Sequence, residues 1–114
     1  MINNLHHYRA TVTRILDGDT VELVIDLGFT VQWKSTCRLY GVNTPELTSK
    51  DPLIRAKALE AKQYLIDKLP VGIQIYIKSR ELDKYGRPLA DVYYSADFKH
   101  INKELLDLAL AVKM

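Results

Sequence analysis

The chain has 114 residues, 47% hydrophobic and 26% charged, so it can form one domain with a real core and is too apolar to be disordered. Its net charge of +2, from 16 Lys and Arg against 14 Asp and Glu, excludes a polybasic coat but allows a local basic patch. Its one cysteine, Cys37, excludes an internal disulfide and, within a strand pattern, is expected to be a buried packing residue.

No apolar run approaches the roughly 18 residues needed to cross a bilayer. The first residues contain no apolar signal-peptide core. We therefore expect a cytoplasmic protein without a membrane partner.

Residues 8–16 are rich in Thr, Val and Ile and predict a first strand, which the Asp17-Gly18 hairpin signal ends. A second strand is expected over 20–26, where alternation puts Val21, Leu23 and Ile25 on one face. Asp19 lies at the open end of that row. Because desolvating a carboxylate costs free energy, Asp19 must meet a cation or hydrogen-bond donors there.

A third strand is expected over 30–40, after a turn at 27–29. The proposed core positions in this strand are Val31, Trp33, Cys37 and Leu39. Simple alternation places Arg38 on the side opposite Cys37 and Leu39, so only a bulge or barrel twist could bring it to Asp19.

The second half of the chain reads as a helix, two strands and a second helix. A helix from Pro52 to about Lys68 has one apolar stripe. Its members are Ile54, Ala58, Ala61, Leu65 and Leu69. Strands are expected over 72–78 and 88–94, joined by a charged loop at 79–86. A last helix over 98–112 would face inward with Ile101, Leu105, Leu108 and Val112.

Five strands with a helix between the third and fourth are typical of a small closed barrel of the OB type, an α+β fold dominated by β. We expect residues 1–114 to form this one domain. A ferredoxin-like α+β arrangement fits the same pattern of elements.

Three short motifs carry most of the chemistry-bearing side chains. They are Asp-Gly-Asp-Thr at 17–20, the stretch from Thr36 to Glu46, and Asp-Lys-Tyr-Gly-Arg at 83–87. Their order and spacing resemble the staphylococcal nuclease-like (thermonuclease) family of calcium-dependent nucleases. The resemblance runs from about Tyr8 to Val112, and it favours the barrel over the ferredoxin-like fold.

Arg38 and Arg87 suit a phosphate clamp, because a guanidinium donates two hydrogen bonds to phosphate oxygens and keeps its proton. Glu46, placed by Pro45, could accept the proton of an attacking water. The resemblance implies that both arginines contact the scissile phosphate and that the 5′ oxygen leaves, giving 3′-phosphate ends on DNA and RNA with little sequence preference.

The resemblance also implies a calcium site at Asp19, Asn43 and Thr44, with Thr44 contributing its backbone carbonyl. Alone, Asp19 would read as a turn residue, as Asp17 does. The family usually has a carboxylate where this chain has Asn43. An amide oxygen can bind calcium but adds no charge, so weaker calcium affinity is expected.

Lys84 and Tyr85 are expected beside the pocket, touching a terminal phosphate and stacking near a nucleotide, although Tyr85 fits a packed hairpin aromatic equally well. Flexible single strands should bind best. Two other functions remain open: a catalytically silent barrel that binds nucleic acid or protein, and a purely structural role. The oligomeric state is not written in the sequence.

Overall fold

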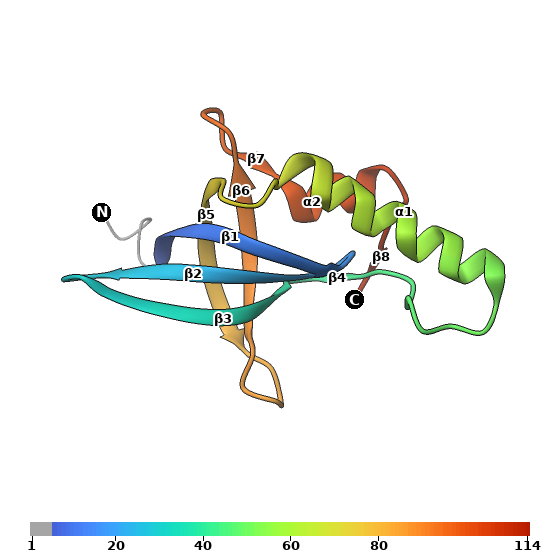
Figure 1. Cartoon of the computed structure of the whole chain (residues 1–114), viewed down its shortest axis with the longest axis horizontal. Helices are drawn as coiled ribbons and strands as arrows, with labels where there is room; N and C mark the ends of the chain where they lie inside the picture. The colour runs from blue at the N-terminus through green and yellow to red at the C-terminus, as the bar shows by residue number, and fades with distance from the viewer. Residues whose placement is uncertain (1–5) are drawn as a thin grey trace.

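Five long strands close into a barrel in the computed structural model, which describes residues 6–114 (Figure 1). Their order is β3-β2-β1-β5-β6, and a short parallel pairing of β3 with β6 closes the ring. The bounds are β1 His7–Asp17, β2 Thr20–Gly28, β3 Val31–Leu39, β5 Gln74–Leu82 and β6 Pro88–Tyr94. The predicted β-dominated OB-type barrel is thus confirmed.

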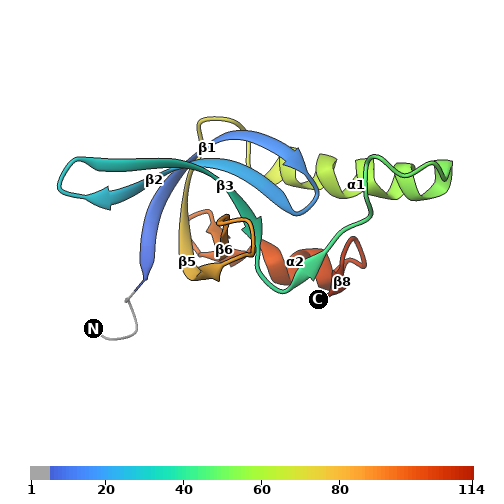
Figure 2. The same ribbon diagram turned by 90° about the horizontal axis from the view of Figure 1, so that it is seen from below.

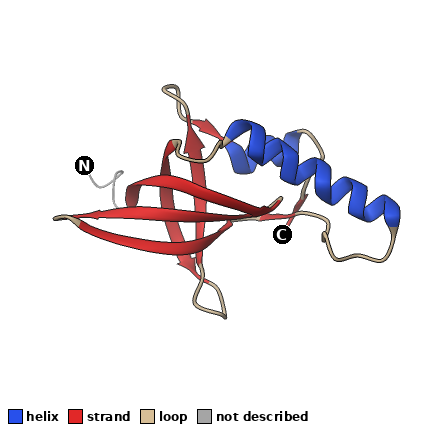
Figure 3. Cartoon of the chain, in the orientation of Figure 1, coloured by secondary structure: helices blue, strands red, loops and turns tan. Residues whose placement is uncertain are grey.

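Two helices lie at one end of the barrel, away from the β2–β3 tip (Figure 3). They are α1, Pro52–Lys68, between the third and fourth long strands, and α2, Ile101–Asp107. Asp51 caps α1 by accepting a 2.9 Å hydrogen bond from the N–H of Leu53. In the described part of the chain, neither helix is both long and apolar enough to span a membrane.

Three two-residue strands complete the fold and were not expected from the sequence. They are β4 (Val42–Asn43), β7 (Lys99–His100) and β8 (Val112–Lys113). Strand β8 pairs with β4, and Val112 lies opposite Asn43. The end of the described chain therefore supports the loop that follows β3. Strand β7 extends the sheet beyond β6.

The inward-facing residues of the barrel form one core with α1 and α2. The expected row Val21, Leu23 and Ile25 is buried, as is Leu39. Cys37 is fully buried as predicted, and burial raises the pKa of its thiol to about 12, which makes it a packing residue.

Two proposed core positions, Val31 and Trp33, are wrong: they are 53% and 41% exposed. The β2–β3 hairpin extends well beyond the rest of the barrel, as Figures 1 and 2 show. Strand β6 pairs with β3 only at Arg38 and Leu39, so among residues 6–114 the outer half of β3 has no strand partner on that edge. Alternation gives the correct face of the strand but not where the barrel stops.

The helix stripes are also corrected at their outer ends. Ile54 is 41% exposed in the first turn of α1, which projects past the barrel. The second helix ends at Asp107, not at Val112, so Leu108 and Val112 are exposed. Ala109 has a left-handed backbone with φ 58°, which turns the chain toward β8. Neither glycine nor proline marks that stop in the sequence.

The first half of the expected loop at 79–86 is strand. Strand β5 continues to Leu82 and pairs with the start of β6 across a register shift between Ser79 and Glu81. Only 83–87 remain as a connecting loop between β5 and β6. Polar side chains there face outward from a paired strand, which composition alone does not distinguish from a loop.

Candidate active site

A pocket of about 180 Å³ lies where the β1–β2 turn, the end of β3 and the start of β6 meet. Its lining residues are Asp17, Asp19, Thr20, Arg38, Asn43, Thr44, Pro45, Glu46 and Arg87. The structure therefore brings together six of the eight side chains singled out in the sequence, from three motifs spread over the chain. Lys84 and Tyr85 do not line the pocket.

The β1–β2 turn places Asp19 because Gly18 lacks a side chain. A Cβ atom at Gly18 would lie 2.7 Å from Cβ of Ala61 in α1 and 3.0 Å from Oγ1 of Thr44. The turn can therefore pack directly on the helix and on the loop after β4. The backbone N–H of Leu39 donates a 2.8 Å hydrogen bond to the carbonyl of Asp19, next to the pair of Thr20 and Arg38, so the end of the β2–β3 pairing brings Asp19 beside Arg38.

Donors surround the buried carboxylate of Asp19. Its Oδ2 accepts a 3.2 Å hydrogen bond from the N–H of Thr44 and lies 3.5 Å from Nη2 of Arg38, while Oδ1 accepts from Thr20 at 3.0 Å. Burial by itself would raise the pKa of Asp19, but a hydrogen bond with Asp17 and these donors hold it below its ordinary value. Asp19 thus presents an ionised carboxylate in a fixed orientation.

Asp17 is a lining residue that the sequence reading treated only as a turn residue. Its Oδ1 does accept a 3.1 Å hydrogen bond from the N–H of Asp19, as a turn carboxylate would. Burial, followed by the hydrogen bond and negative charge of Asp19, raises its pKa. Two carboxyl groups therefore share this side of the pocket, and the signal available in the sequence was their i, i+2 spacing.

Arg38 connects the two sides of the pocket. Thr20 of β2 and Leu89 of β6 are its register partners, and its Nη2 donates a 3.2 Å hydrogen bond to Oδ1 of Asn43. The same nitrogen lies 3.5 Å from Asp19. The guanidinium is thereby oriented toward the pocket by a carboxylate and an amide.

Glu46 follows β4 in a stretch without regular structure and is exposed at the pocket rim. Its backbone carbonyl accepts a 3.2 Å hydrogen bond from Ser49, which turns the chain toward α1. The carboxylate of Glu46 has no hydrogen-bond partner among the described residues, so it is available to a water or ligand.

Arg87 is held by the loop between β5 and β6. Asp83 Oδ2 accepts a 2.8 Å hydrogen bond from Nε of Arg87, and Oδ1 accepts from the backbone N–H groups of Tyr85 and Arg87 at 2.8 and 2.9 Å. With Nε engaged, the two terminal nitrogens of the guanidinium are left for an anion. Gly86, at φ 79°, lets the loop close this tightly.

Asp83 organises this loop and was missed in the sequence, where it read as one charge among several. Desolvation would raise its pKa, but the N–H groups of Arg87 and Tyr85 and the Arg87 guanidinium lower it below the ordinary value. The available signal was Asp-x-x-Gly at a strand end, which is typical of a turn.

Lys84 and Tyr85 lie on the solvent side of Arg87. The ring of Tyr85 is 72% exposed, with Nζ of Lys84 5.2 Å and the Arg87 guanidinium 5.6 Å from its centroid. Tyr85 is therefore not the packed hairpin aromatic that the sequence also allowed. Both side chains are accessible beside the pocket without lining it.

The oxygen atoms that line the pocket are of the type that binds calcium. Carboxylate oxygens of Asp17 and Asp19, the amide oxygen of Asn43 and the carbonyl of Thr44 are the hard oxygens that calcium prefers. Among residues 6–114, however, no three His, Cys, Asp or Glu side chains are grouped to hold a metal. A calcium ion here would depend on neutral oxygens and water as well as on carboxylates.

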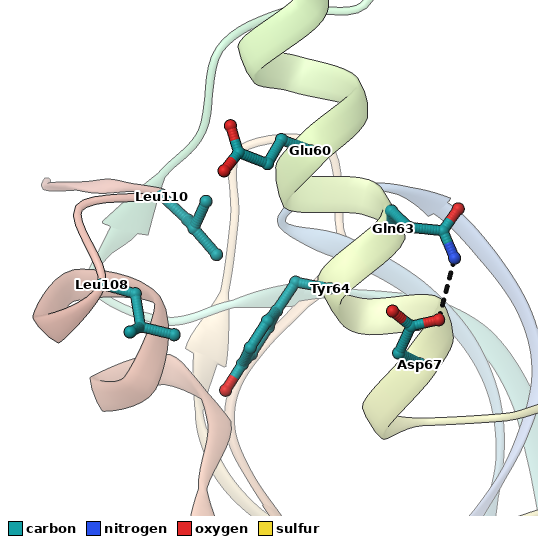
Figure 4. Close-up of a pocket in the computed structure, with 6 residues that line it drawn as sticks. All are labelled: Glu60, Gln63, Tyr64, Asp67, Leu108 and Leu110. Atoms are coloured by element: carbon teal, nitrogen blue, oxygen red, sulfur yellow. Dashed lines mark hydrogen bonds between the residues drawn. The ribbon is translucent and has the colours of Figure 1, made fainter.

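A second, larger pocket of about 470 Å³ lies between α1 and α2 (Figure 4). Its lining residues are Glu60, Gln63, Tyr64, Asp67, Leu108 and Leu110. These include two carboxylates and no cation, so the pocket repels phosphate groups. Electrostatics therefore favours the smaller pocket as the site for an anionic ligand.

Comparisons with known proteins show which family the chain belongs to. The family model described as staphylococcal nuclease homologue matches residues 36–114. A relative named micrococcal nuclease, from Shigella flexneri, is 31% identical over 86 residues, covering 75% of this chain and 42% of the relative. The chain thus spans under half the length of that relative. Because the family model matches well over half of the residues, the chain belongs to the staphylococcal nuclease homologue family.

Proposed function

We propose that the protein is a calcium-dependent phosphodiesterase that hydrolyses DNA and RNA at the pocket of Asp19, Arg38 and Arg87. The observation that carries this proposal is the convergence of two guanidinium groups, an exposed carboxylate and a set of hard oxygen ligands in one small pocket. Family membership and the micrococcal nuclease relative support it.

Arg38 and Arg87 bind the non-bridging oxygens of the scissile phosphate in this proposal. A phosphodiester resists attack because its negative charge repels the nucleophile, and that charge grows on the oxygens as the reaction proceeds. Fixed donors aimed at those oxygens stabilise the transition state more than the ground state. Asp83 and Asn43 orient the two guanidinium groups, so little reorganisation is needed.

Glu46 orients the attacking water and accepts its proton. Its carboxylate is exposed at the rim and lines the same pocket as both arginines. The water attacks phosphorus, the 5′ oxygen leaves, and the product carries a 3′-phosphate.

Asp19, Asn43 and the Thr44 carbonyl would hold the calcium ion, which when bound would offset phosphate charge. The carboxyl of Asp17 is a second source of negative charge on that side. Because Asn43 contributes none, half-maximal activity should need more calcium than in a relative with a carboxylate there.

The proposed substrate is a flexible single strand with little sequence preference. The contacts proposed are to phosphate and to base faces, which carry no base-edge information. Lys84 and Tyr85 would contact a neighbouring phosphate and base, because both lie exposed on the outer side of Arg87.

The experiment is cleavage of labelled single-stranded DNA in calcium and in chelator by the wild type and by Glu46→Ala and Arg87→Ala. Matched controls are Glu60→Ala and Arg55→Ala, exposed residues of α1 outside the pocket. The proposal expects calcium-dependent cleavage that falls by about 10²–10³-fold in the Arg87 variant and is unchanged in the controls.

A second candidate function is a catalytically silent nucleic-acid-binding barrel, which the neutral Asn43 favours. Such a barrel would bind DNA in calcium without cleaving it. The wild type, Glu46→Ala and Arg87→Ala would then all leave the DNA intact. Intact but retarded DNA under every condition would therefore replace the hydrolytic proposal with this one.

A further inference from the structure

A row of aromatic and cationic side chains crosses four strands on the outer side of the barrel. The strand register places Arg9 opposite Tyr76, Tyr76 opposite Tyr93, and Tyr93 opposite His100. Directly opposed residues of antiparallel strands point to the same side of a sheet. The alternate residues of β5 and β6 are buried in the core, so this row faces outward.

Tyr76, Tyr93, Phe98 and His100 form what is here called the aromatic face. The rings of Tyr93 and His100 stack with centroids 4.8 Å apart at 18°, and those of Tyr76 and Phe98 are 5.1 Å apart. These contacts hold the rings in place, so they lose little conformational freedom when a flat ligand stacks on them. Phe98 remains 57% exposed and offers the most ring surface.

The backbone of Phe98 is strained in a way that glycine would relieve. Its φ is 53°, in the left-handed region that side chains larger than glycine rarely adopt. The turn between β6 and β7 thus presents a large exposed ring against Tyr76 at a conformational cost.

The charge around the aromatic face is suited to a polyanion. Lys78 lies on the same side of β5 as Tyr76, and Arg80 reaches Asp91, the register partner of Lys78. The carboxylate of Asp91 is buried and receives Nε of Arg80 at 2.6 Å and Nε2 of His100 at 3.0 Å, so its charge is compensated. Two exposed carboxylates border the face: Asp26, opposite Arg9 in register, and Asp97, next to Phe98 in the chain.

The aromatic face is continuous with the candidate active site along β6. Leu89 is the register partner of Arg38, and Tyr93 points to the same side four residues later, about 13 Å along the strand. Between them, the guanidinium of Arg80 lies 5.0 Å from the ring of Tyr40, which is 40% exposed. A strand whose phosphate is bound at Arg38 can therefore continue over this surface.

We propose that the aromatic face binds unpaired bases of a single nucleic-acid strand, adjacent to the phosphate held at Arg38. Bases stack on the exposed rings, and phosphates contact Arg9, Lys78 and Arg80. Such stacking tolerates any sequence, because every base has a flat face. The placement of the strand rests on the proposed function. If the aromatic face binds bases, the protein should bind a strand long enough to reach it more tightly than a dinucleotide.

The test measures fluorescence anisotropy of a labelled thymidine dinucleotide and of an oligothymidylate of about 12 nucleotides, within the range that one OB barrel covers. Glu46→Gln protein in calcium is used, and the recovered oligonucleotides are checked for cleavage. Phe98→Gly and Tyr76→Ala should each weaken binding of the long strand by about five-fold or more and leave the dinucleotide unchanged.

Phe29→Gly is the matched control, because Phe29 is 98% exposed at the β2–β3 tip and has a left-handed φ of 55°. Both glycine variants should fold, since glycine adopts these angles without strain. Arg9→Gln should lower the slope of log K against log salt by about 0.7 if Arg9 contacts one phosphate.

The proposal is overturned if the long strand binds no more tightly than the dinucleotide, or if Phe98→Gly and Tyr76→Ala bind it like the parent protein. An equal loss in Phe29→Gly would also overturn it. Failure of the proposed function is distinguishable, because it would appear as absent calcium-dependent cleavage by protein that retains Glu46.

Discussion

Arg38 donates a 3.2 Å hydrogen bond to the side-chain oxygen of Asn43 across the candidate active site. The same guanidinium nitrogen lies 3.5 Å from the Asp19 carboxylate. The residue proposed to bind phosphate is thus oriented by two residues proposed to bind calcium. Compared with a carboxylate, the neutral Asn43 offsets less of the positive charge of Arg38, which favours phosphate binding. It also provides less negative charge to attract a calcium ion.

Asn43→Asp should lower the calcium concentration that gives half-maximal cleavage. The added carboxylate supplies a second full charge to the oxygen ligands, and calcium affinity rises with ligand charge. The measurement is a calcium titration of the cleavage rate, with Asn43→Ala expected to shift the midpoint upward. A midpoint that both variants leave unchanged would remove Asn43 from the calcium site.

Asp83→Ala should reduce the cleavage rate through Arg87. Asp83 does not line the pocket but accepts hydrogen bonds from Nε of Arg87 at 2.8 Å and from its backbone N–H at 2.9 Å. A misplaced guanidinium can cost about 10²-fold in rate. In a double-mutant cycle, Asp83→Ala combined with Arg87→Ala should be no slower than Arg87→Ala alone. Additive losses would mean that Asp83 acts independently of Arg87.

Gly18→Ala should destabilise the protein and disturb the proposed calcium ligands together. The new methyl group would meet Ala61 at 2.7 Å and Thr44 at 3.0 Å, and the Ala61 contact belongs to a packed helix that cannot move cheaply. Overpacking of this kind costs about 1–3 kcal/mol. Urea denaturation checks the free energy of unfolding, and Gly28→Ala, where the Cβ meets nothing, separates packing from backbone strain.

Gly28 has a left-handed φ of 84° and Gly18 does not, so Gly28→Ala carries backbone strain without a clash, and Gly18→Ala carries a clash without that strain. If Gly28→Ala raised the calcium requirement as much as Gly18→Ala, the contact with Ala61 and Thr44 would not be what positions Asp19.

Asp17→Asn should stabilise the calcium-free protein at neutral pH. The pKa of Asp17 is raised above 3.8 on folding, first by burial and then by Asp19, so the folded state holds the proton more tightly than the unfolded chain. Stability is therefore lost as pH rises from the unfolded toward the folded pKa. Asparagine has no such proton and can still accept the N–H of Asp19.

Thermal unfolding in chelator at several pH values measures this effect. The advantage of Asp17→Asn should disappear below the ordinary carboxyl pKa, where Asp17 is protonated in both states. An advantage that is the same at acidic and neutral pH would show that the charge of Asp17 is not its cause.

Local signals predicted the strands, since alternation gave the buried row that ends at Asp19. The choice of the barrel over a ferredoxin-like fold, and the grouping of Asn43, Thr44 and Glu46 with Asp19, came from the order and spacing of the three motifs, which resemble those of the family. What alternation could not give was the end of the β2–β3 pairing, where Leu39 donates a backbone hydrogen bond to Asp19 beside Arg38. That arrangement depends on contacts between strands rather than on the residues of one strand.

The errors share a different cause, which is how far neighbouring elements extend. Trp33 lies on the expected inward face but beyond the end of the β3–β6 pairing. Leu108 follows helical spacing but comes after the helix has stopped at Asp107. Asp83 was missed because its role depends on folding back onto Arg87, which only the closed loop reveals.

The most direct test of the hydrolytic proposal is the single-turnover rate of calcium-dependent cleavage by Glu46→Gln beside the wild type. Glutamine keeps the size of the side chain but cannot accept the proton of the attacking water. We expect the rate to fall by about 10²–10⁴-fold while the calcium-bound protein still binds the strand. A Glu46→Gln protein that cleaves as fast as the wild type would contradict the proposed mechanism.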